Sequence, residues 1–250
     1  DPEMLKLNRV SLSPGLVLGS EPTGGANAGD FYSQAVAHFQ KNQHTLDGRL
    51  SGQDQLPAPI LAVLEDLDKL VASGAECEGM TYAFTHTPRQ FDVGLFYEPA
   101  DDLNNVANAL SRLARHHYAA KQYDEAQKVL KHQFMLGCHM DRERSRVWMA
   151  EQGMTIQKLA LGDMLAVRAA AKQTDGNADL RKYLDELNGE LTFYRSKRTS
   201  MWTRRPTPGD AFRIIEKDED RAWRIQALLQ LGVIRYTADN RGDIEKAEQL

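Results

Sequence analysis

Apolar residues recur at helical spacing along most of this chain, and each recurrence predicts one amphipathic helix. The first two stripes cover residues 31–39 and 60–71, with a polar segment between them. Pro57 and Pro59 are both suited to start the second helix, and Gly74 is suited to end it. A helix with one apolar face needs another element to cover that face. The two stripes therefore predict an antiparallel helical hairpin.

Four more stripes follow in the C-terminal part of the chain, which makes the predicted fold class all-α. Asp101 and Asp102 are suited to cap the first of these helices, and we expect Gly137 to end the second. Gly153 and Gly162 lie inside the third, where we expect them to allow close helix packing. The stripes cover residues 103–114, 123–134, 147–167 and 180–194, and a final helix pair is predicted at residues 218–238 and from residue 242 onward.

The turn between the first two of these four helices carries a recognisable motif. Leu113–Ala114 and His117 are followed by residues 121–126, Lys-Gln-Tyr-Asp-Glu-Ala, and then by Leu130. This run resembles the tetratricopeptide repeat (TPR), and a small residue such as Ala126 is needed where its two helices cross closely. The resemblance implies antiparallel helix pairs stacked as a TPR-like α-solenoid, and a role in binding other proteins.

A second, partial match covers residues 240–247 and is preceded by Leu231–Gly232 and Tyr236. Here Leu231–Gly232 lie three residues too far from the turn. The two matches are 121 residues apart, which is not a whole number of 34-residue TPR units. We therefore expect degenerate repeats, and the resemblance covers about a quarter of the chain. It bears on architecture and not on a particular activity.

These patterns divide the chain into three parts. Residues 1–26 are rich in Pro and Gly without periodicity and predict an extended, irregular N-terminal arm. Residues 27–100 contain the first helical hairpin, followed at residues 80–97 by either a short β-hairpin or a structured loop. Residues 101–250 form the TPR-like helical repeat region.

Charge and hydropathy restrict the class of protein. Residues 1–100 include 6 basic and 13 acidic side chains, whereas residues 101–250 include 25 and 22, so the C-terminal part is only mildly cationic. No apolar stretch approaches the roughly 18 residues that cross a membrane. The chain begins at Asp1 without an initiator Met, which fits both an exported protein whose leader has been removed and a cytoplasmic protein.

The seven histidines give no metal-binding motif. His116–His117, His132 and His139 are the one local concentration. Neighbouring helix residues point about 100° apart, so His116 and His117 are not placed to share one ion, and no HExxH sequence is present. We expect His117 to fill a position between helices and His116 to face solvent.

Cys77 and Cys138 are the only cysteines, and they lack the CxxC spacing of zinc and redox motifs. Either they form a single disulfide in an oxidising compartment, or they are two small buried side chains. Cys138 also precedes His139, with Asp141 close by in sequence. Adjacency alone does not supply the hydrogen-bonded geometry that activates a thiolate, so we predict no catalytic cysteine.

Residues 194–213 interleave basic and aromatic side chains, a pattern that binds phosphates or stacks on bases. Flanking acidic segments weaken the field, and no nucleic-acid-binding module is recognisable, so we do not expect a nucleic-acid partner. The alternative is a connection between helices whose arginines pair with neighbouring carboxylates. The candidate polyanion-binding residues are Arg195, Lys197, Arg198, Arg204 and Arg205.

Two functional hypotheses follow from these patterns. The leading one is an interaction scaffold with no catalytic residues and no cofactor, whose stacked helix pairs bind a protein or peptide partner. The alternative is an enzyme or small-ligand-binding domain with a pocket near residues 80–97. A deep pocket with convergent titratable groups favours the alternative, and a shallow groove favours the scaffold.

Overall fold

The computed structural model describes residues 24–46, 55–80, 98–142 and 147–203. Within these ranges the chain is mostly helical, as the apolar stripes predict, with seven helices and one pair of short strands. The strands are β1 (Gly24–Asn27) and β2 (Cys77–Gly79), and the helices are α2 (Ala28–Lys41), α3 (Gln43–Leu46), α4 (Ala58–Ala75), α5 (Glu98–Ala119), α6 (Tyr123–Arg142), α7 (Val147–Ala170) and α8 (Asn177–Thr203).

The ends of the first hairpin follow local capping chemistry. Asn27 precedes α2, and its side-chain oxygen accepts a hydrogen bond from the backbone N–H of Gly29 at 3.1 Å. Pro57 stands immediately before α4 and Pro59 lies in its first turn, as predicted. The helix ends at Ala75, one residue beyond the predicted Gly74.

A parallel pair of strands closes the first hairpin. Gly24 of β1 lies opposite Cys77 of β2, and Asn27 lies opposite Gly79. The sequence patterns did not indicate this pair, because strands this short carry no readable alternation and residues 24–26 fall in the predicted arm. The pairing ties the start of α2 to the end of α4. The predicted β-hairpin or loop at residues 80–97 lies, apart from Met80, outside the described residues.

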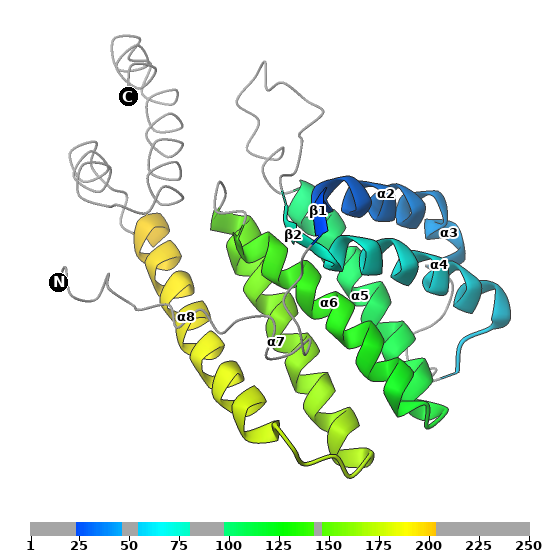
Figure 1. Cartoon of the computed structure of the whole chain (residues 1–250). Helices are drawn as coiled ribbons and strands as arrows, with labels where there is room; N and C mark the ends of the chain where they lie inside the picture. Colours follow the sequence, from blue (N-terminus) through cyan, green and yellow to red (C-terminus); the bar gives the residue numbers. More distant parts are fainter. Residues whose placement is uncertain (1–23, 47–54, 81–97, 143–146, 204–250) are drawn as a thin grey trace, which may run out of the picture.

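Helix α6 lies at the centre of the described fold and is buried on every side along its second half. All residues from Gln133 to Met140 are buried. Helices α4, α5 and α7 all pack against α6, and Figure 1 shows it lying between α7 and the pair α4 and α5. A helix enclosed in this way carries mostly small or apolar side chains, and its buried polar residues Gln133 and His139 both make hydrogen bonds.

Two glycines bring α6 and α7 into close contact. A Cβ atom added to Gly153 would lie 2.5 Å from the backbone nitrogen of Asp141, and one added to Gly137 would lie 2.7 Å from the carbonyl oxygen of Gly153. The expected role of Gly153 in close packing is therefore confirmed. The expectation that Gly137 ends its helix is wrong, because α6 continues to Arg142 and uses this glycine for the crossing. Gly162 faces open space and makes no close packing contact.

A buried polar network extends the contact to α8. Gln157 of α7 donates from Nε2 to the carbonyl oxygen of Gly137 at 3.2 Å. Its Oε1 accepts a hydrogen bond from the hydroxyl of Tyr183 on α8 at 2.9 Å. Burial raises the pKa of Tyr183, which keeps the hydroxyl protonated as a donor. Helices α6, α7 and α8 are thus joined through one glutamine side chain.

The turns after α5 and α7 have the same backbone conformation. Lys121 has a φ of 61° and Lys172 a φ of 58°, both in the left-handed region. In the first turn Gln122 N–H donates to His117 O at 2.8 Å, five residues earlier, which is the hydrogen bond of a Schellman motif. Helices α5 and α6 measure 22 and 20 residues, so this hairpin is longer than a 34-residue TPR unit.

The α6–α7 crossing can be tested with two glycine variants. We expect Gly153→Ala to lower the free energy of unfolding by about 2 kcal/mol, because the added methyl group collides with the backbone of α6. The control is Gly162→Ala, which should raise it by about 0.5–1 kcal/mol through helix propensity. Urea unfolding measures both. Equal effects of the two variants would contradict the close crossing.

A second test concerns the α5–α6 hairpin. Ala126 is fully buried, so Ala126→Arg should lower the free energy of unfolding by about 3 kcal/mol, because it overpacks the crossing and buries a charge. Ala166→Arg on the exposed side of α7 is the control and should change stability little. Thermal unfolding followed by circular dichroism checks this pair, and an unchanged melting temperature for Ala126→Arg would refute the buried position.

Candidate functional site

Helices α4, α5 and α6 line an open groove of about 420 Å³, called the α4–α6 groove below. Its floor is apolar, because Leu113 and Val129 are buried and Leu61 is half-buried. Its rim is polar and mostly exposed, with Asp68, His116 and His117 half-buried. The polar lining residues are Glu65, Asp68 and Lys69 from α4, His116 and His117 from α5, Gln122 from the turn, and Glu125 and Lys128 from α6.

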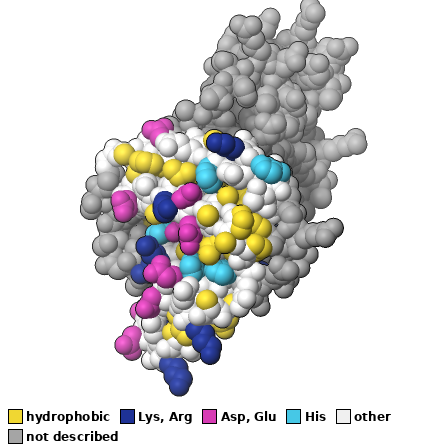
Figure 2. All heavy atoms as spheres, turned by 90° about the vertical axis from the view of Figure 1, so that its right-hand side faces the viewer, with side chains coloured by type: hydrophobic (Ala, Val, Ile, Leu, Met, Phe, Trp, Pro, Cys, Tyr) yellow, Lys and Arg dark blue, Asp and Glu magenta, His cyan; other side chains and the backbone are white. Residues whose placement is uncertain are grey.

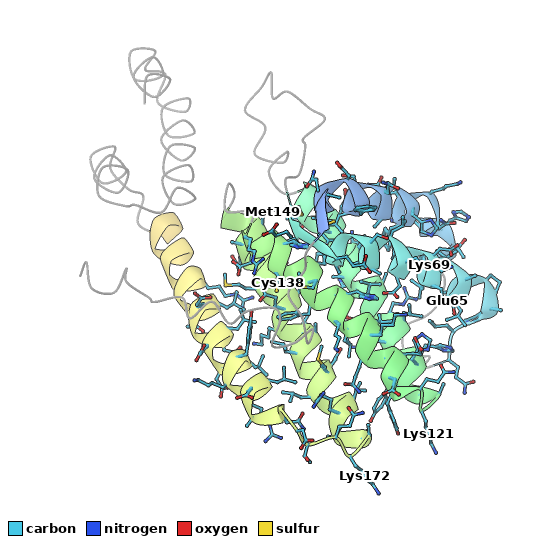
Figure 3. The ribbon with its side chains drawn as sticks, viewed as in Figure 1. Glu65, Lys69, Lys121, Cys138, Met149 and Lys172 are labelled. Atoms are coloured by element: carbon cyan, nitrogen blue, oxygen red, sulfur yellow. The ribbon has the colours of Figure 1, made fainter. Side chains whose placement is uncertain are left out.

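The figures show how this rim is presented. Figure 3 places Glu65 and Lys69 on the outer side of α4, and Lys121 at the nearby turn between α5 and α6. Figure 2 faces this side of the molecule and shows histidine, acidic and basic side chains gathered around exposed hydrophobic ones. The groove therefore combines an apolar floor with a rim of both charge signs.

Several rim charges already have partners. His132 Nδ1 lies 2.8 Å from Asp68 Oδ1, and since a carboxylate only accepts, this nitrogen carries the proton. Lys69 Nζ lies 2.8 Å from Asp66 Oδ1, which lowers the pKa of that carboxyl and raises the pKa of the lysine. Both pairs fix side chains beside the groove.

The two adjacent histidines take different roles. His116 Nδ1 accepts a hydrogen bond from the backbone N–H of Leu56 at 3.1 Å, so His116 fastens the segment before α4. The expectation that His116 faces solvent is wrong for this reason. His117 Nδ1 lies 2.8 Å from Gln122 Oε1, a bond within its own hairpin. The rings meet edge to face with centroids 5.6 Å apart.

His139 lies in the core, apart from the groove. Its Nε2 lies 3.0 Å from the carbonyl oxygen of Cys77, and its Nδ1 lies 2.7 Å from the hydroxyl oxygen of Tyr32. Because a carbonyl only accepts, Nε2 carries the proton and Nδ1 accepts from Tyr32. Burial lowers the pKa of His139 to about 4, and burial raises the pKa of Tyr32. Both side chains are therefore neutral near pH 7.

This network has structural consequences for the cysteines. Both nitrogens of His139 are engaged by Tyr32 and by the Cys77 carbonyl, so neither is turned to the adjacent Cys138 as a base. Cys77 and Cys138 are both buried thiols and form no disulfide. Burial also raises the pKa of Cys77, which disfavours its thiolate. Of the two alternatives, the structure shows the pair of small buried side chains.

The candidate polyanion-binding residues are only partly described. Arg195 is on α8, and its Nε donates to Oε1 of the buried Glu151 on α7 at 3.1 Å. This is the arginine–carboxylate pairing of the alternative hypothesis. Lys197 and Arg198 lie on α8, but their side chains are outside the described part of the structure, as are Arg204 and Arg205. For these four residues polyanion binding stays a prediction.

The sequence patterns did not single out Glu65 and Asp68 as lining a groove. The available signal was the spacing of Leu61, Glu65 and Asp68, which puts one apolar and two acidic side chains on the same face of α4. What completes the groove is the packing of α5 and α6 against that face. The expected pocket near residues 80–97 lies outside the described residues.

Three further findings bear on function. In the ranges that the structure describes, no cluster of three or more His, Cys, Asp or Glu side chains is arranged to hold a metal ion. None of the helices in those ranges is long and apolar enough to span a membrane. Comparisons of the chain with protein-family models, curated proteins and solved structures find no match.

The buried histidine makes stability depend on pH. The unfolded chain binds a proton at the ordinary histidine pKa of about 6.5, whereas His139 in the folded state binds one only near pH 4. The contribution of His139 to the free energy of unfolding is complete above pH 6.5. It falls by about 3 kcal/mol in total as the pH drops toward 4. Urea unfolding between pH 4 and 7.5 should show this loss, and His139→Gln should remove most of it. The exposed variant His44→Gln is the control, and a pH profile that His139→Gln leaves unchanged would contradict the prediction.

Proposed function

We propose that this protein is an interaction scaffold whose stacked helical hairpins bind a segment of a partner protein. The binding site in this proposal is the α4–α6 groove. The observation that carries it is the combination, in one open groove, of a floor of Leu61, Leu113 and Val129 with an exposed polar rim. Peptide-binding sites combine apolar floors that anchor side chains with polar groups that fix register.

The arrangement of the helices supports this proposal. Helix α6 packs on both α5 and α7, and α5 also packs on α7, which is the order of neighbours in a stack of helical hairpins. Such stacks present extended surfaces for other proteins. The TPR resemblance of residues 113–130 points to the same class of function.

The lining of the groove favours binding over chemistry. Its described side chains include no Ser, Thr, Cys or Tyr that would serve as a nucleophile. Its histidines are held by hydrogen bonds to Leu56 and Gln122, within the scaffold itself. The groove is also open rather than an enclosed cavity, as expected for a surface that binds a peptide.

Site-specific photo-crosslinking tests the proposal. A benzophenone amino acid at Lys69, on the exposed rim, should form adducts with a discrete protein in native extract. Leu61→Arg, which places a charge on the apolar floor, should abolish these adducts while the circular dichroism spectrum stays the same. The control places the same probe at the exposed Lys182 of α8. Adducts that form equally from both positions, or that persist in Leu61→Arg, would refute the groove as the binding site.

A further inference from the structure

The turns after α5 and α7 share their sequence as well as their conformation. Residues 119–122 and 170–173 are both Ala-Ala-Lys-Gln, and Lys172 lies 51 residues after Lys121. The hydrogen bonds match too, because Gln173 N–H donates to Arg168 O at 2.8 Å, as Gln122 N–H does to its partner five residues earlier. An identical tetrapeptide in an identical Schellman turn defines an alignment of the two hairpins.

The same 51-residue shift relates six pairs of core positions. All members of the pairs are buried. The pairs are Leu103 with Met154, Leu110 with Leu161, Leu113 with Met164, Val129 with Leu180, Leu136 with Leu187 and Met140 with Leu191. At these six positions and at the turn the hairpins α5–α6 and α7–α8 are therefore equivalent, whereas Leu130 and Phe134 of α6 are buried and their counterparts on α8, Arg181 and Asp185, are exposed.

The match between the two hairpins also relates the two places where a hairpin packs on the preceding helix, which are called joints below. The first joint is α4 against α5 and α6, and the second is α6 against α7 and α8. In the second joint, Arg168 donates from Nε to Asn177 Oδ1 at 2.7 Å and from Nη2 to the carbonyl of Asp175. Its Nη1 donates across the joint to Gln127 Oε1 on α6 at 3.4 Å, and Gln127 Nε2 donates to Gln173 Oε1 at 2.9 Å. A guanidinium group thus fills the second joint.

In the first joint the same positions line the groove. His117 stands where the second unit has Arg168, and Gln122 stands where it has Gln173. The imidazole of His117 bonds to Gln122 inside its own hairpin, whereas Arg168 reaches across to the preceding helix. The α4–α6 groove therefore occupies the position that a guanidinium occupies in the second joint.

The charges of the rim suit a cation at this position. Exposed carboxylates stand on both α4 and α6, at Glu65 and Glu125. Of the two lysines in the lining, Lys69 is already paired with Asp66, and Lys128 is exposed on α6, one turn after Glu125. Arginine meets carboxylates through a planar array of donors, and its aliphatic stem packs on apolar surface.

On the basis of the function proposed above, we propose that the partner segment inserts an arginine side chain into the α4–α6 groove. The guanidinium lies between Glu65 and Glu125, and the stem covers the apolar floor at Leu61. The partner arginine takes the place in the first joint that Arg168 takes in the second.

The test uses a phage library of random twelve-residue peptides selected on the full chain. Enriched sequences should contain arginine, and a synthetic peptide from the selection should bind about tenfold more weakly when that arginine is replaced by citrulline, which keeps the shape and loses the charge. Glu65→Gln and Glu125→Gln should weaken the arginine peptide and leave the citrulline peptide unchanged. Asp185→Asn, on the exposed side of α8, is the matched control.

The outcomes separate this inference from the function on which it rests. Peptides that need Leu61 for binding but tolerate citrulline would overturn the arginine site and leave the scaffold function standing. A selection that yields no peptide sensitive to Leu61→Arg would overturn both. Arginine peptides that bind equally to Glu65→Gln, Glu125→Gln and the unaltered chain would also overturn the arginine site.

Discussion

The described fold depends on the approach of α6 to α7 at Gly137 and Gly153. Because neither position has a side chain, the two backbones come close enough for Gln157 to reach the carbonyl of Gly137 and for Tyr183 to reach Gln157. This contact makes α6 the interior helix, enclosed by α4, α5 and α7. Interior placement in turn explains why its second half is buried without a polar face.

The two joints differ although the hairpins match at the turn and at six core positions. The second joint is closed by backbone contact at the glycines and by the Arg168 side chain near the turn. Among the described residues, His117 takes the position of that guanidinium in the first joint, and the groove lies beside it. One architectural unit thus serves as a structural element in one place and as a candidate binding site in the other.

Helix positions were predictable from the sequence because burial on one face leaves a periodic trace within a single segment. The stripe of residues 60–71 gave α4 with its proline start, and the stripe of residues 180–194 gave α8. Contacts between distant segments leave no such trace, so the β1–β2 pair and the groove were not predicted. The role of Gly137 was misread for the same reason. The match between the hairpins does not appear at the 34-residue period of the TPR, because the turns repeat after 51 residues.

The hydrogen bond between Tyr32 and His139 joins residues 107 positions apart. During synthesis on the ribosome, α2 and α4 emerge before α6, so this hydrogen bond forms only after His139 has been translated. The N-terminal hairpin therefore reaches its final state only after the middle of the chain has been translated. A ribosome pause after α4 would expose this hairpin to chaperones and proteases, including the side chains of Leu67 and Val71, which are buried in the complete fold.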